Sequence, residues 1–493
     1  MPKKVAVIGA GIGGIAVSAR LAAKGYEIDV FEKNDRPGGK MSEIRHEGFR
    51  FDTGPSLFTL PNLIGELFEL VDDDFASHFK YSKQPVVCRY FYEDGMIINA
   101  YGETEEFAEE LHRKAGEDSK NVIRYLGESS RIYDFTYPVF INNSLHRFRN
   151  YYSKDFIRAL FLLPKLKPFK TLHEINQRSF THPNTVQLFD RFATYNGSDP
   201  FKTPATMMVI PHLEHNLGAY FPVKGMYEIA QSLKSLYERM GVRFYFNCEV
   251  QEILLSGNKV AGLRVNGEDF LDYKIIVSDL DIYFLYKKLL KKLPFPEKWF
   301  RHERSTSALI FYWGMETESP GLDLHNILFS ADYQQEFNCL FNLRTLHSDP
   351  TVYIFISSKV VAEDAPAGCE NWFVMINTPE NVGQDWDLMI NDVRGQIEKK
   401  IKRITGIDIS QHRKFEFILD PRGIEEKTAS YRGSLYGNSS NTIWAAFQRH
   451  PNFSKIRGLY YTGGSVHPGG GIPLCLSSAK IVADMIPSIK KIN

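Results

Sequence analysis

The start of the chain alternates between short apolar runs and a segment of small residues. Residues 4–8 form an apolar run that predicts a strand, residues 15–23 predict a helix, and residues 28–31 predict a second strand. The glycine-rich segment 9–14 separates the first strand from the helix. This order is typical of a βαβ unit, from which dinucleotide-binding sheets are built.

The hydrophobic period changes several times further along the chain. Residues 105–192 have a mostly helical pattern. The pattern also predicts β-rich runs at 242–255, 259–266, 270–277, 308–313 and 351–356, a helix at 386–405, and a final strand and helix at 459–461 and 474–486. Because strands and a glycine loop return at the end of the chain, we expect the last residues to complete the sheet that the first residues begin.

These elements predict an α/β fold with α+β insertions, in which a discontinuous, Rossmann-like domain is interrupted by a second domain that faces the substrate. The chain length of 493 residues suits such a two-domain arrangement. The predicted dinucleotide domain comprises residues 1–80, 221–285 and 436–493, and the predicted second domain comprises a helical part, 81–220, and a β-rich part, 286–435.

Composition and charge narrow the class of protein. Hydrophobic residues make up 43% and charged residues 24%, which is ordinary for a globular chain. The 59 basic residues balance the 59 acidic ones, so we expect no nucleic-acid partner. Aromatic residues make up 13%, which suits a large apolar core or a large apolar ligand site. The five cysteines are scattered without a CxxC pair, so we expect neither a disulfide framework nor a metal site.

The chain begins with a strand and a glycine turn, which does not resemble an export signal. The uncharged stretch 458–479 holds six glycines and two prolines, so we expect no transmembrane helix there. A cytoplasmic protein is the expectation from these two features.

Gly9, Gly11 and Gly14 form the pattern G-x-G-x-x-G directly after the first predicted strand. The first glycine permits the tight turn, the second lets the backbone approach a pyrophosphate, and the third lets helix and strand pack closely. The helix that begins near Gly13 directs its N–H groups at the phosphates. Glu32 ends the second strand, where a carboxylate accepts hydrogen bonds from an adenosine ribose.

Two further glycine-rich segments favour FAD over NAD. Residues 36–40, with Gly38 and Gly39, offer a second close backbone approach just after Glu32, and residues 51–56 form a rigid loop that can bracket a flavin ring. The C-terminal loop 462–473 precedes a helix whose N-terminus would face the flavin and stabilise negative charge on it.

The sequence resembles the bacterial and fungal phytoene desaturase family, the carotenoid desaturases of the flavin amine-oxidase superfamily. The matching segments are 7–14, 32–40, 51–56, 194–200, 221–226 and 463–473. They span the chain from start to end, and residues 52–61 look most like the subgroup that desaturates 1'-hydroxylated carotenoids at C3–C4. The resemblance implies a dinucleotide domain of the glutathione-reductase/amine-oxidase type, non-covalent FAD, a long apolar carotenoid tunnel and attachment to the inner face of the membrane.

The resemblance also implies roles for single residues. Glu32 would bind the adenosine ribose, Lys40 would lie near the phosphates, and Val250 would reach the adenine through its backbone. The predicted cofactor-binding residues are Gly9, Gly11, Gly13, Gly14, Glu32, Lys33, Gly38, Gly39, Lys40, Gly54, Pro55, Ser56, Leu57, Val250, Asp279, Gly463, Gly464, Ser465, Gly471, Ile472 and Pro473.

Making a C=C bond from two adjacent C–H groups removes a hydride and a proton. No side chain accepts a hydride, so the flavin would do so, and oxygen or a quinone would reoxidise it. Asp199, His212 and Glu214 are candidate proton acceptors, although a helix cap, a core histidine and a surface carboxylate are their structural alternatives. One of them could instead hydrogen-bond a hydroxyl group on the substrate.

Residues 147–170 hold seven basic residues, one acidic residue and many aromatic and apolar ones. This composition is typical of an interfacial helix on anionic lipid, and a helix with a solvated basic face is the alternative. Three other functions stay open at this point. The chain could be a phytoene desaturase, an amine oxidase, or a non-catalytic isoprenoid carrier such as the prenyl-chain chaperones of vesicle-trafficking GTPases.

Overall fold

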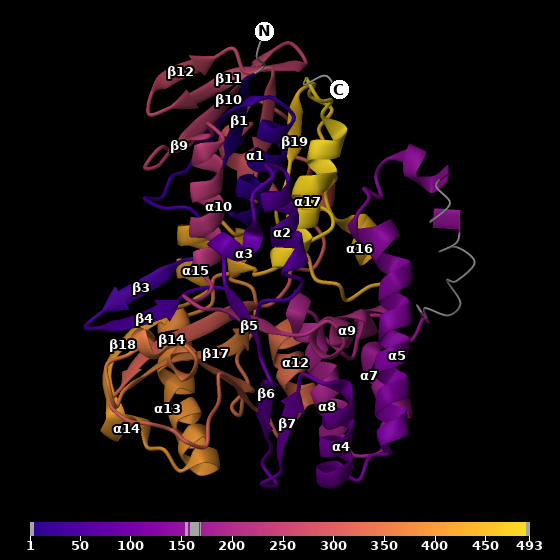
Figure 1. The fold of residues 1–493 in the computed structure, drawn as a ribbon, viewed down its shortest axis with the longest axis vertical. Helices are drawn as coiled ribbons and strands as arrows, with labels where there is room; N and C mark the ends of the chain where they lie inside the picture. The colour runs from indigo at the N-terminus through magenta and orange to yellow at the C-terminus, as the bar shows by residue number, and fades with distance from the viewer. Residues whose placement is uncertain (1–3, 153–155, 158–166, 168, 490–493) are drawn as a thin grey trace.

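Two sheets of different kinds organise the chain. The structure is a computed structural model, and it describes residues 4–152, 156–157, 167 and 169–489 (Figure 1). A five-stranded parallel sheet lies at one end of the molecule, and a seven-stranded sheet lies at the other. The first sheet combines segments from the beginning, middle and end of the sequence, as the indigo, rose and yellow ribbons at the top of Figure 1 show.

The parallel sheet has the strand order β19 (Leu459–Tyr461), β13 (Ile275–Ser278), β1 (Lys4–Ile8), β2 (Glu27–Phe31) and β9 (Arg243–Tyr245). Every neighbouring pair in it is parallel. The strands predicted at the start and at the end of the chain are confirmed, and they lie in one sheet on either side of β13.

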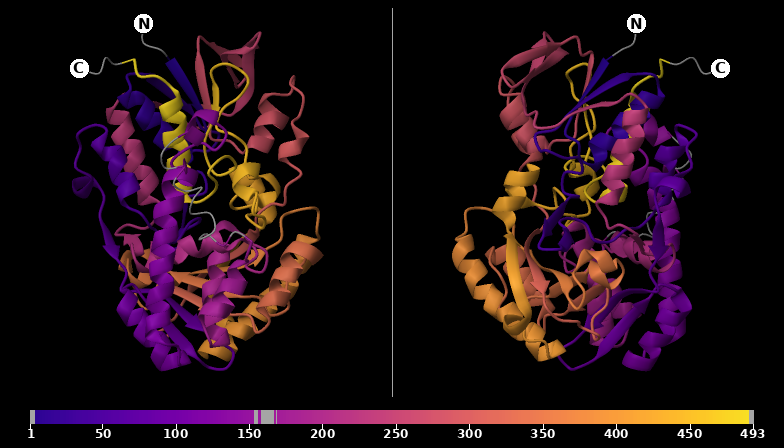
Figure 2. Two further views of the ribbon diagram at one scale, coloured as in Figure 1. Left: turned by 90° about the vertical axis from the view of Figure 1, so that its right-hand side faces the viewer. Right: turned by 60° about the vertical axis from the view of Figure 1, so that its left-hand side comes forward.

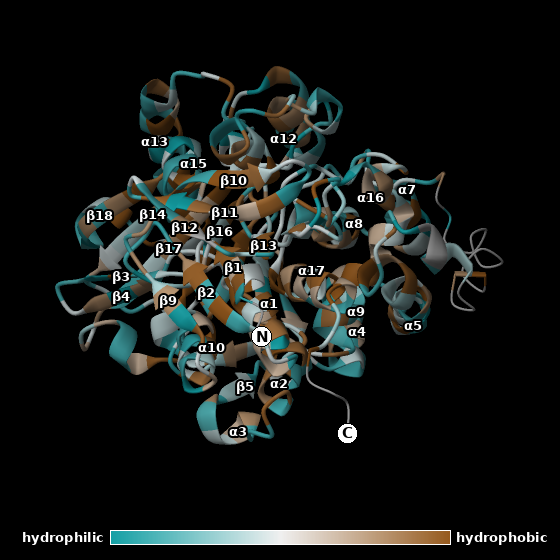
Figure 3. Ribbon diagram, turned by 90° about the horizontal axis from the view of Figure 1, so that it is seen from above, coloured by the Kyte–Doolittle hydropathy of each residue, from teal (hydrophilic) through white to brown (hydrophobic). Residues whose placement is uncertain are grey.

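The two faces of this sheet pack against different layers. On β1, Val5 and Val7 belong to the core formed with helices α1 (Ile12–Ala23), α10 (Glu228–Arg239) and α17 (Ile472–Met485). Ala6 and Ile8 point to the other face and pack on the three-stranded sheet of β10 (Val250–Ser256), β11 (Lys259–Val265) and β12 (Glu268–Leu271). This alternation follows from the two-residue period of a strand. Seen from above, hydrophobic residues gather around β1, β2 and α17 (Figure 3).

The larger sheet has the strand order β18 (Arg413–Leu419), β14 (Ser307–Met315), β17 (Glu370–Thr378), β16 (Val352–Ile356), β15 (His325–Leu328), β6 (Val86–Phe91) and β7 (Ile97–Tyr101). All of its neighbours are antiparallel except β15 and β6. One face is covered by α13 (Trp386–Thr405), against which Leu309, Phe311 and Trp313 pack. The intervening residues of β14 point to the opposite face, which forms one wall of the cavity described below.

Helices from the middle of the sequence flank the β6–β7 end of this sheet (Figure 2). They are α4 (Thr104–Ala115), α5 (Ser119–Thr136), α7 (Leu172–Ser179), α8 (Pro183–Asp190), α9 (Val209–His215) and α12 (Tyr333–Asn338). The shorter elements are β3 (Glu43–His46), β4 (Phe49–Asp52), β5 (Tyr81–Lys83), β8 (Tyr220–Pro222), α2 (Asn62–Glu69), α3 (Phe75–His78), α11 (Ile282–Phe284), α14 (Ile409–His412), α15 (Pro421–Thr428) and α16 (Ala445–Gln448). The boundaries predicted for the two domains stay a prediction.

The predicted interfacial segment 147–170 lies partly outside the described residues. Within the described ranges, no helix combines the length and the apolar character that crossing a bilayer requires. The five cysteines are free.

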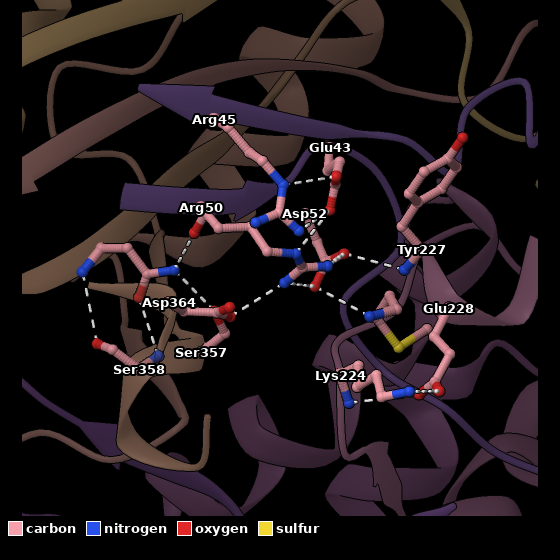
Figure 4. Close-up of polar contacts among 12 residues, drawn as sticks. Glu43, Arg45, Arg50, Asp52, Lys224, Tyr227, Glu228, Ser357, Ser358 and Asp364 are labelled. Carbon is pink, nitrogen blue, oxygen red and sulfur yellow. Dashed lines mark hydrogen bonds and ion pairs between the residues drawn. The ribbon is translucent and has the colours of Figure 1, made fainter. Parts of the chain in front are cut away.

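A buried cluster of charges ties the two sheets together (Figure 4). The guanidinium of Arg50, on β4, pairs with Asp52 at 2.7 Å, with Glu43 at 2.7 Å and with Asp364 at 3.0 Å. Asp52 in turn accepts hydrogen bonds from the backbone N–H groups of Met226 and Tyr227, each at 3.0 Å. The cluster therefore joins the β3–β4 hairpin to the segment that begins α10 and to the loop that follows β16.

The buried position makes this cluster sensitive to the loss of one partner. The Arg50 side chain is 6% exposed, and burial raises the pKa of Asp364 to about 6, although the Arg50 charge lowers it. Removing Arg50 would leave two buried carboxyl groups without their cation, which costs more than the ion pairs themselves gain.

We therefore expect Arg50→Met to lower the free energy of unfolding by about 3–5 kcal/mol. Arg45 offers a matched control, because it also pairs with Glu43, at 2.8 Å, but its side chain is 68% exposed. Arg45→Met should change stability by less than about 1 kcal/mol. Chemical unfolding of the FAD-loaded variants measures both effects, and equal losses would contradict a special role for the buried cluster.

Candidate functional site

A single cavity of about 2170 Å³ runs from the glycine turn after β1 to the inner face of the seven-stranded sheet. Nineteen of the predicted cofactor-binding residues line it: Gly9, Gly11, Gly13, Glu32, Lys33, Gly38, Gly39, Lys40, Gly54, Pro55, Ser56, Leu57, Val250, Asp279, Gly464, Ser465, Gly471, Ile472 and Pro473. The remaining two, Gly14 and Gly463, support the backbone beside these residues. The structure thus brings the predicted cofactor residues together from all parts of the chain.

The glycine turn has the tight geometry that the motif predicts. Gly9 has a φ of +94°, which favours glycine, and its N–H donates to the carbonyl of Phe31 at 2.8 Å. A Cβ on Gly14 would lie 2.1 Å from the carbonyl oxygen of Gly9, so helix α1 can approach the strand only through glycine. The first turn of α1 therefore faces the cavity with its backbone N–H groups.

Asp279 connects this turn to the C-terminal loop. A Cβ on Gly11, Gly13 or Gly463 would lie 2.3–2.5 Å from a carboxylate oxygen of Asp279. Burial raises the pKa of Asp279 to about 7, the N–H of Gly14 and the Lys40 charge lower it, and the Glu32 charge raises it. The backbones at Gly11 and Gly463, 452 positions apart in the sequence, can both contact the side chain of Asp279 because neither residue carries a Cβ.

Glu32 lies where the motif predicts it, buried at the end of β2 with 5% of its surface exposed. Its Oε2 accepts a hydrogen bond from the N–H of Ala10 at 2.8 Å, and its Oε1 accepts one from the N–H of Asn34 at 2.9 Å. The carboxylate is thereby fixed at the rim of the glycine turn, a position that suits a ribose.

Lys40 lines the cavity, and its predicted position near the phosphates stays a prediction. Its ammonium is buried and donates to the carbonyl of Leu435 at 2.7 Å, and burial lowers its pKa. The charge therefore connects the N-terminal glycine segment to residues 434–435. An ammonium group has three N–H donors, so Lys40 can keep this backbone partner and also donate to a phosphate.

The part of the cavity beyond residues 54–57 is mainly apolar. Alternate residues of the large sheet form its wall, because every second side chain of a strand points to the same face. The apolar wall residues are Ala308, Ile310, Phe373, Met375, Phe417 and Leu419. Polar side chains gather where β15 and β16 reach the same space, and they are His325, Tyr353, Arg191 and Glu214.

Only one of the three candidate proton acceptors lines this cavity. Glu214, on α9, is 1% exposed, and burial raises its pKa to about 7, although the Arg191 charge lowers it. Arg191 Nη2 lies 3.5 Å from Glu214 Oε2. Among the described residues, neither oxygen of Glu214 has a hydrogen-bond partner.

The contacts of Asp199 and His212 agree with the structural roles considered for them, a cap and a core histidine. Asp199 accepts a hydrogen bond from the N–H of Phe201 at 2.9 Å and caps that turn. The Nδ1 atom of His212 pairs with the side-chain amide of Asn216 at 2.8 Å, and its ring packs on Tyr133. Neither residue is among the described residues that line the cavity, and a direct catalytic role for either stays a prediction.

Several residues of the cavity carry no signal in the sequence. Arg191, His325 and Tyr353 come from three distant elements, and no local motif marks them. Arg449 is 4% exposed, lines the cavity, and donates to the carbonyl oxygens of Tyr436 and Asn438 at 3.2 and 3.1 Å. Burial lowers its pKa to about 10. A buried cation with backbone partners is suited to an anionic part of a cofactor.

The parallel sheet, the glycine turn, Glu32 and the second helix N-terminus at α17 define a dinucleotide-binding protein of the flavin type. The residues present fit FAD, because Gly11, Gly13, Gly38 and Gly39 line the cavity without a side chain that would obstruct a pyrophosphate, and Glu32 lines it beside them. The cavity volume of about 2170 Å³ leaves room for a second large molecule beside the cofactor, since single-ligand pockets usually measure roughly 300–1,000 Å³.

Comparison with known proteins agrees with this class. Residues 12–487 match the family described as flavin containing amine oxidoreductase. The chain is 48% identical over 487 residues to 1-hydroxycarotenoid 3,4-desaturase from Flavobacterium sp. (strain P99-3), covering 99% of both proteins. It is 28% identical over 513 residues to phytoene desaturase from Fusarium fujikuroi, covering 98% of this chain and 89% of that protein. An oxidoreductase from Methanosarcina mazei has a similar fold, with a TM-score of 0.61 at 14% identity over 98% of this chain and 100% of that one.

The chain therefore belongs to the flavin containing amine oxidoreductase family, and it is a flavin-dependent oxidoreductase. The predicted fold class, the FAD cofactor and the resemblance to the carotenoid desaturases are confirmed.

We expect Gly14→Ala to abolish stable FAD binding, because the added Cβ meets the backbone oxygen of Gly9. FAD absorbance that remains with the protein after gel filtration measures this loss. Gly127→Ala on α5 is the control, since nothing lies within 4 Å of its added Cβ. That variant should retain FAD and gain roughly 0.5–1 kcal/mol of stability. Wild-type FAD retention by Gly14→Ala would contradict the close helix–strand approach.

Proposed function

We propose that this protein is an FAD-dependent carotenoid desaturase that introduces the 3,4 double bond into a 1'-hydroxylated carotenoid. The observation that carries the proposal is the single cavity, which joins the FAD cradle to a long apolar space with a few polar groups at one end. The identity of 48% to a protein named for this reaction supports the same substrate class. A fully apolar substrate, such as phytoene, would offer these polar groups no hydrogen bond.

The chemistry divides between the cofactor and the chain. When bound, FAD accepts a hydride from one carbon while the neighbouring carbon loses a proton, so that a C=C bond replaces two C–H bonds. The glycine segments hold the cofactor, and the apolar wall of Ile310, Phe373 and Leu419 aligns the carotenoid and excludes water. The electron acceptor that restores the oxidised cofactor stays a prediction, with oxygen and a quinone as the two choices.

A second part of the cavity lining supports delivery from a lipid surface. Four exposed apolar residues line it there, and we call them the apolar rim: Phe169 (85% exposed), Trp444 (60%), Ile443 (39%) and Phe447 (39%). Phe447 lies 6.4 Å from Phe140, between ring centres, so the rim lies beside the end of α5. Exposed tryptophan and phenylalanine side chains are typical of segments that enter the membrane interface. We propose that a carotenoid passes from the membrane through this rim without crossing water.

Trp444→Glu should weaken binding to vesicles of anionic phospholipid and slow desaturation of vesicle-borne carotenoid severalfold, because a charged side chain resists the interface. Leu388→Glu on α13 is the control, since Leu388 is also exposed, at 59%, but lies on the helix that covers the other face of the sheet. Vesicle co-sedimentation and detergent-solubilised activity separate the two steps. Equal vesicle binding by both variants would contradict the proposed entrance.

The assignment is tested by mixing the FAD-loaded protein in liposomes, without oxygen, with a 1'-hydroxylated carotenoid or with phytoene. We expect the visible flavin band to bleach with the hydroxylated substrate, and the carotenoid spectrum to shift to the red, because the conjugated system lengthens. Bleaching with phytoene alone would instead identify a phytoene desaturase. Tight binding of both carotenoids with an unchanged flavin spectrum would identify a carrier.

A further inference from the structure

The polar end of the cavity contains buried groups whose hydrogen-bonding capacity is unused. We call Arg191, Glu214, His325, Tyr353 and Ser56 the polar pocket. Arg191, Glu214 and His325 are 8%, 1% and 3% exposed, and all five residues line the cavity. Buried polar groups without partners cost free energy, so a protein that keeps several of them at one place usually uses them to bind a ligand.

Glu214 lies beside a fixed cation, but its carboxylate oxygens form no hydrogen bond among the described residues. Its carboxylate lies 3.5 Å from the Arg191 guanidinium, and neither of its oxygens has a hydrogen-bond partner among the described residues. Arg191 is itself fixed, because its Nη2 donates to the hydroxyl of Tyr90 at 2.6 Å and its guanidinium stacks over the rings of Tyr90 and Tyr195. Glu214 is therefore held on a rigid support in the cavity lining, and both of its oxygens are buried without a hydrogen-bond partner among the described residues.

His325 completes a chain of hydrogen bonds that begins at the cofactor side of the cavity. Ser56 Oγ lies 2.7 Å from the hydroxyl of Tyr353, and this hydroxyl lies 2.8 Å from Nδ1 of His325. The other ring nitrogen, Nε2, is buried without a partner among the described residues. In one tautomer Nε2 donates a hydrogen bond, and in the other it accepts one, so either form can bind a hydroxyl group.

These groups face the same space. Strand β15 runs parallel to β6 with Ile327 opposite Tyr90, so His325, two residues before Ile327, shares the face from which Tyr90 reaches Arg191. Arg191 lies 3.5 Å from Glu214, and all three residues line the same cavity.

We propose that Glu214 and His325 bind the hydroxyl group of the carotenoid, and that this contact sets which carbon–carbon bond meets the flavin. The inference deepens the proposed function and depends on it. A hydroxyl group can donate one hydrogen bond and accept others, which matches a carboxylate and an imidazole. When both positions are counted from the hydroxylated end of the carotenoid, the hydroxyl-bearing carbon and C3 are only two bonds apart. Ser56 links the pocket to the loop predicted to contact the flavin.

A carotenoid needs such a contact because its apolar chain does not define its own register. Apolar contacts are non-directional, so a repeating polyene can slide along an apolar wall at little cost. A hydrogen bond at one end fixes the position of the chain. It also rejects an analogue that lacks the hydroxyl, because the buried groups then stay unpaired.

The test uses the FAD-loaded full-length protein with a 1'-hydroxylated carotenoid and its counterpart without the hydroxyl. We expect wild type to prefer the hydroxylated substrate by on the order of 100-fold or more in kcat/KM. Glu214→Leu and His325→Phe should each lose about 10- to 100-fold with the hydroxylated substrate and little with the other, and products with misplaced double bonds should appear. Glu214→Gln should retain most of the preference, because an amide still binds a hydroxyl.

Asp199→Asn is the matched control, since Asp199 caps a turn outside the cavity lining and asparagine can do the same. Equal losses with both substrates would overturn the inference and identify a general acid–base or structural role. No preference in wild type would also overturn it, while leaving the desaturase assignment intact. Carotenoid turnover absent for both substrates in wild type would instead refute the proposed function. Carotenoid binding, followed by quenching of tryptophan fluorescence, provides the same comparison for any variant that folds without turning over.

Discussion

The structure depends on one close approach, in which glycine backbones from both ends of the chain meet around Asp279. Gly11 and Gly13 come from the first turn of α1, and Gly463 comes from the loop before α17. A Cβ on any of these glycines would lie 2.3–2.5 Å from a carboxylate oxygen of Asp279. Because this contact is possible, two helix N-termini can face the same cavity, and the cofactor cradle is completed only when the last residues have joined the first.

The large sheet then gives the cavity its second half. On β14, one set of alternate residues packs against α13 and the other set lines the cavity. The sheet is therefore both a core element and a substrate wall, and its position relative to the cradle must be fixed. Arg50 and its carboxylate partners supply that connection from a buried position (Figure 4).

The sequence was informative where function depends on local geometry. A strand, a glycine turn, a helix and Glu32 follow one another within about thirty residues, so each could be predicted from spacing alone. The return of strand and glycine signals at the end of the chain predicted that the last residues join the first in one sheet, but it did not predict the order of the strands.

The substrate side was less predictable, because its residues meet only through long-range packing. Glu214 was a candidate together with Asp199 and His212, and only burial and the cavity lining distinguish them. His325 and Tyr353 lie on strands β15 and β16, where a strand pattern shows which residues share a face but not which element lies opposite. Arg191 lies in a helical turn after α8, and no local motif marks it. Of the apolar rim, Phe169 lies in the segment 147–170 that the sequence predicts to be interfacial, whereas no motif in the sequence marks Ile443, Trp444 and Phe447.

The central claim is that one cavity holds a flavin and an oriented carotenoid whose polar end is fixed by Glu214 and His325. An experimental structure of the FAD-loaded protein with its desaturated, hydroxylated product tests this claim most directly. The account predicts the product hydroxyl within about 2.6–3.2 Å of Glu214 or His325 Nε2, with the new double bond against the flavin ring. A product bound in the opposite direction, with its hydroxyl at the apolar rim, would contradict it.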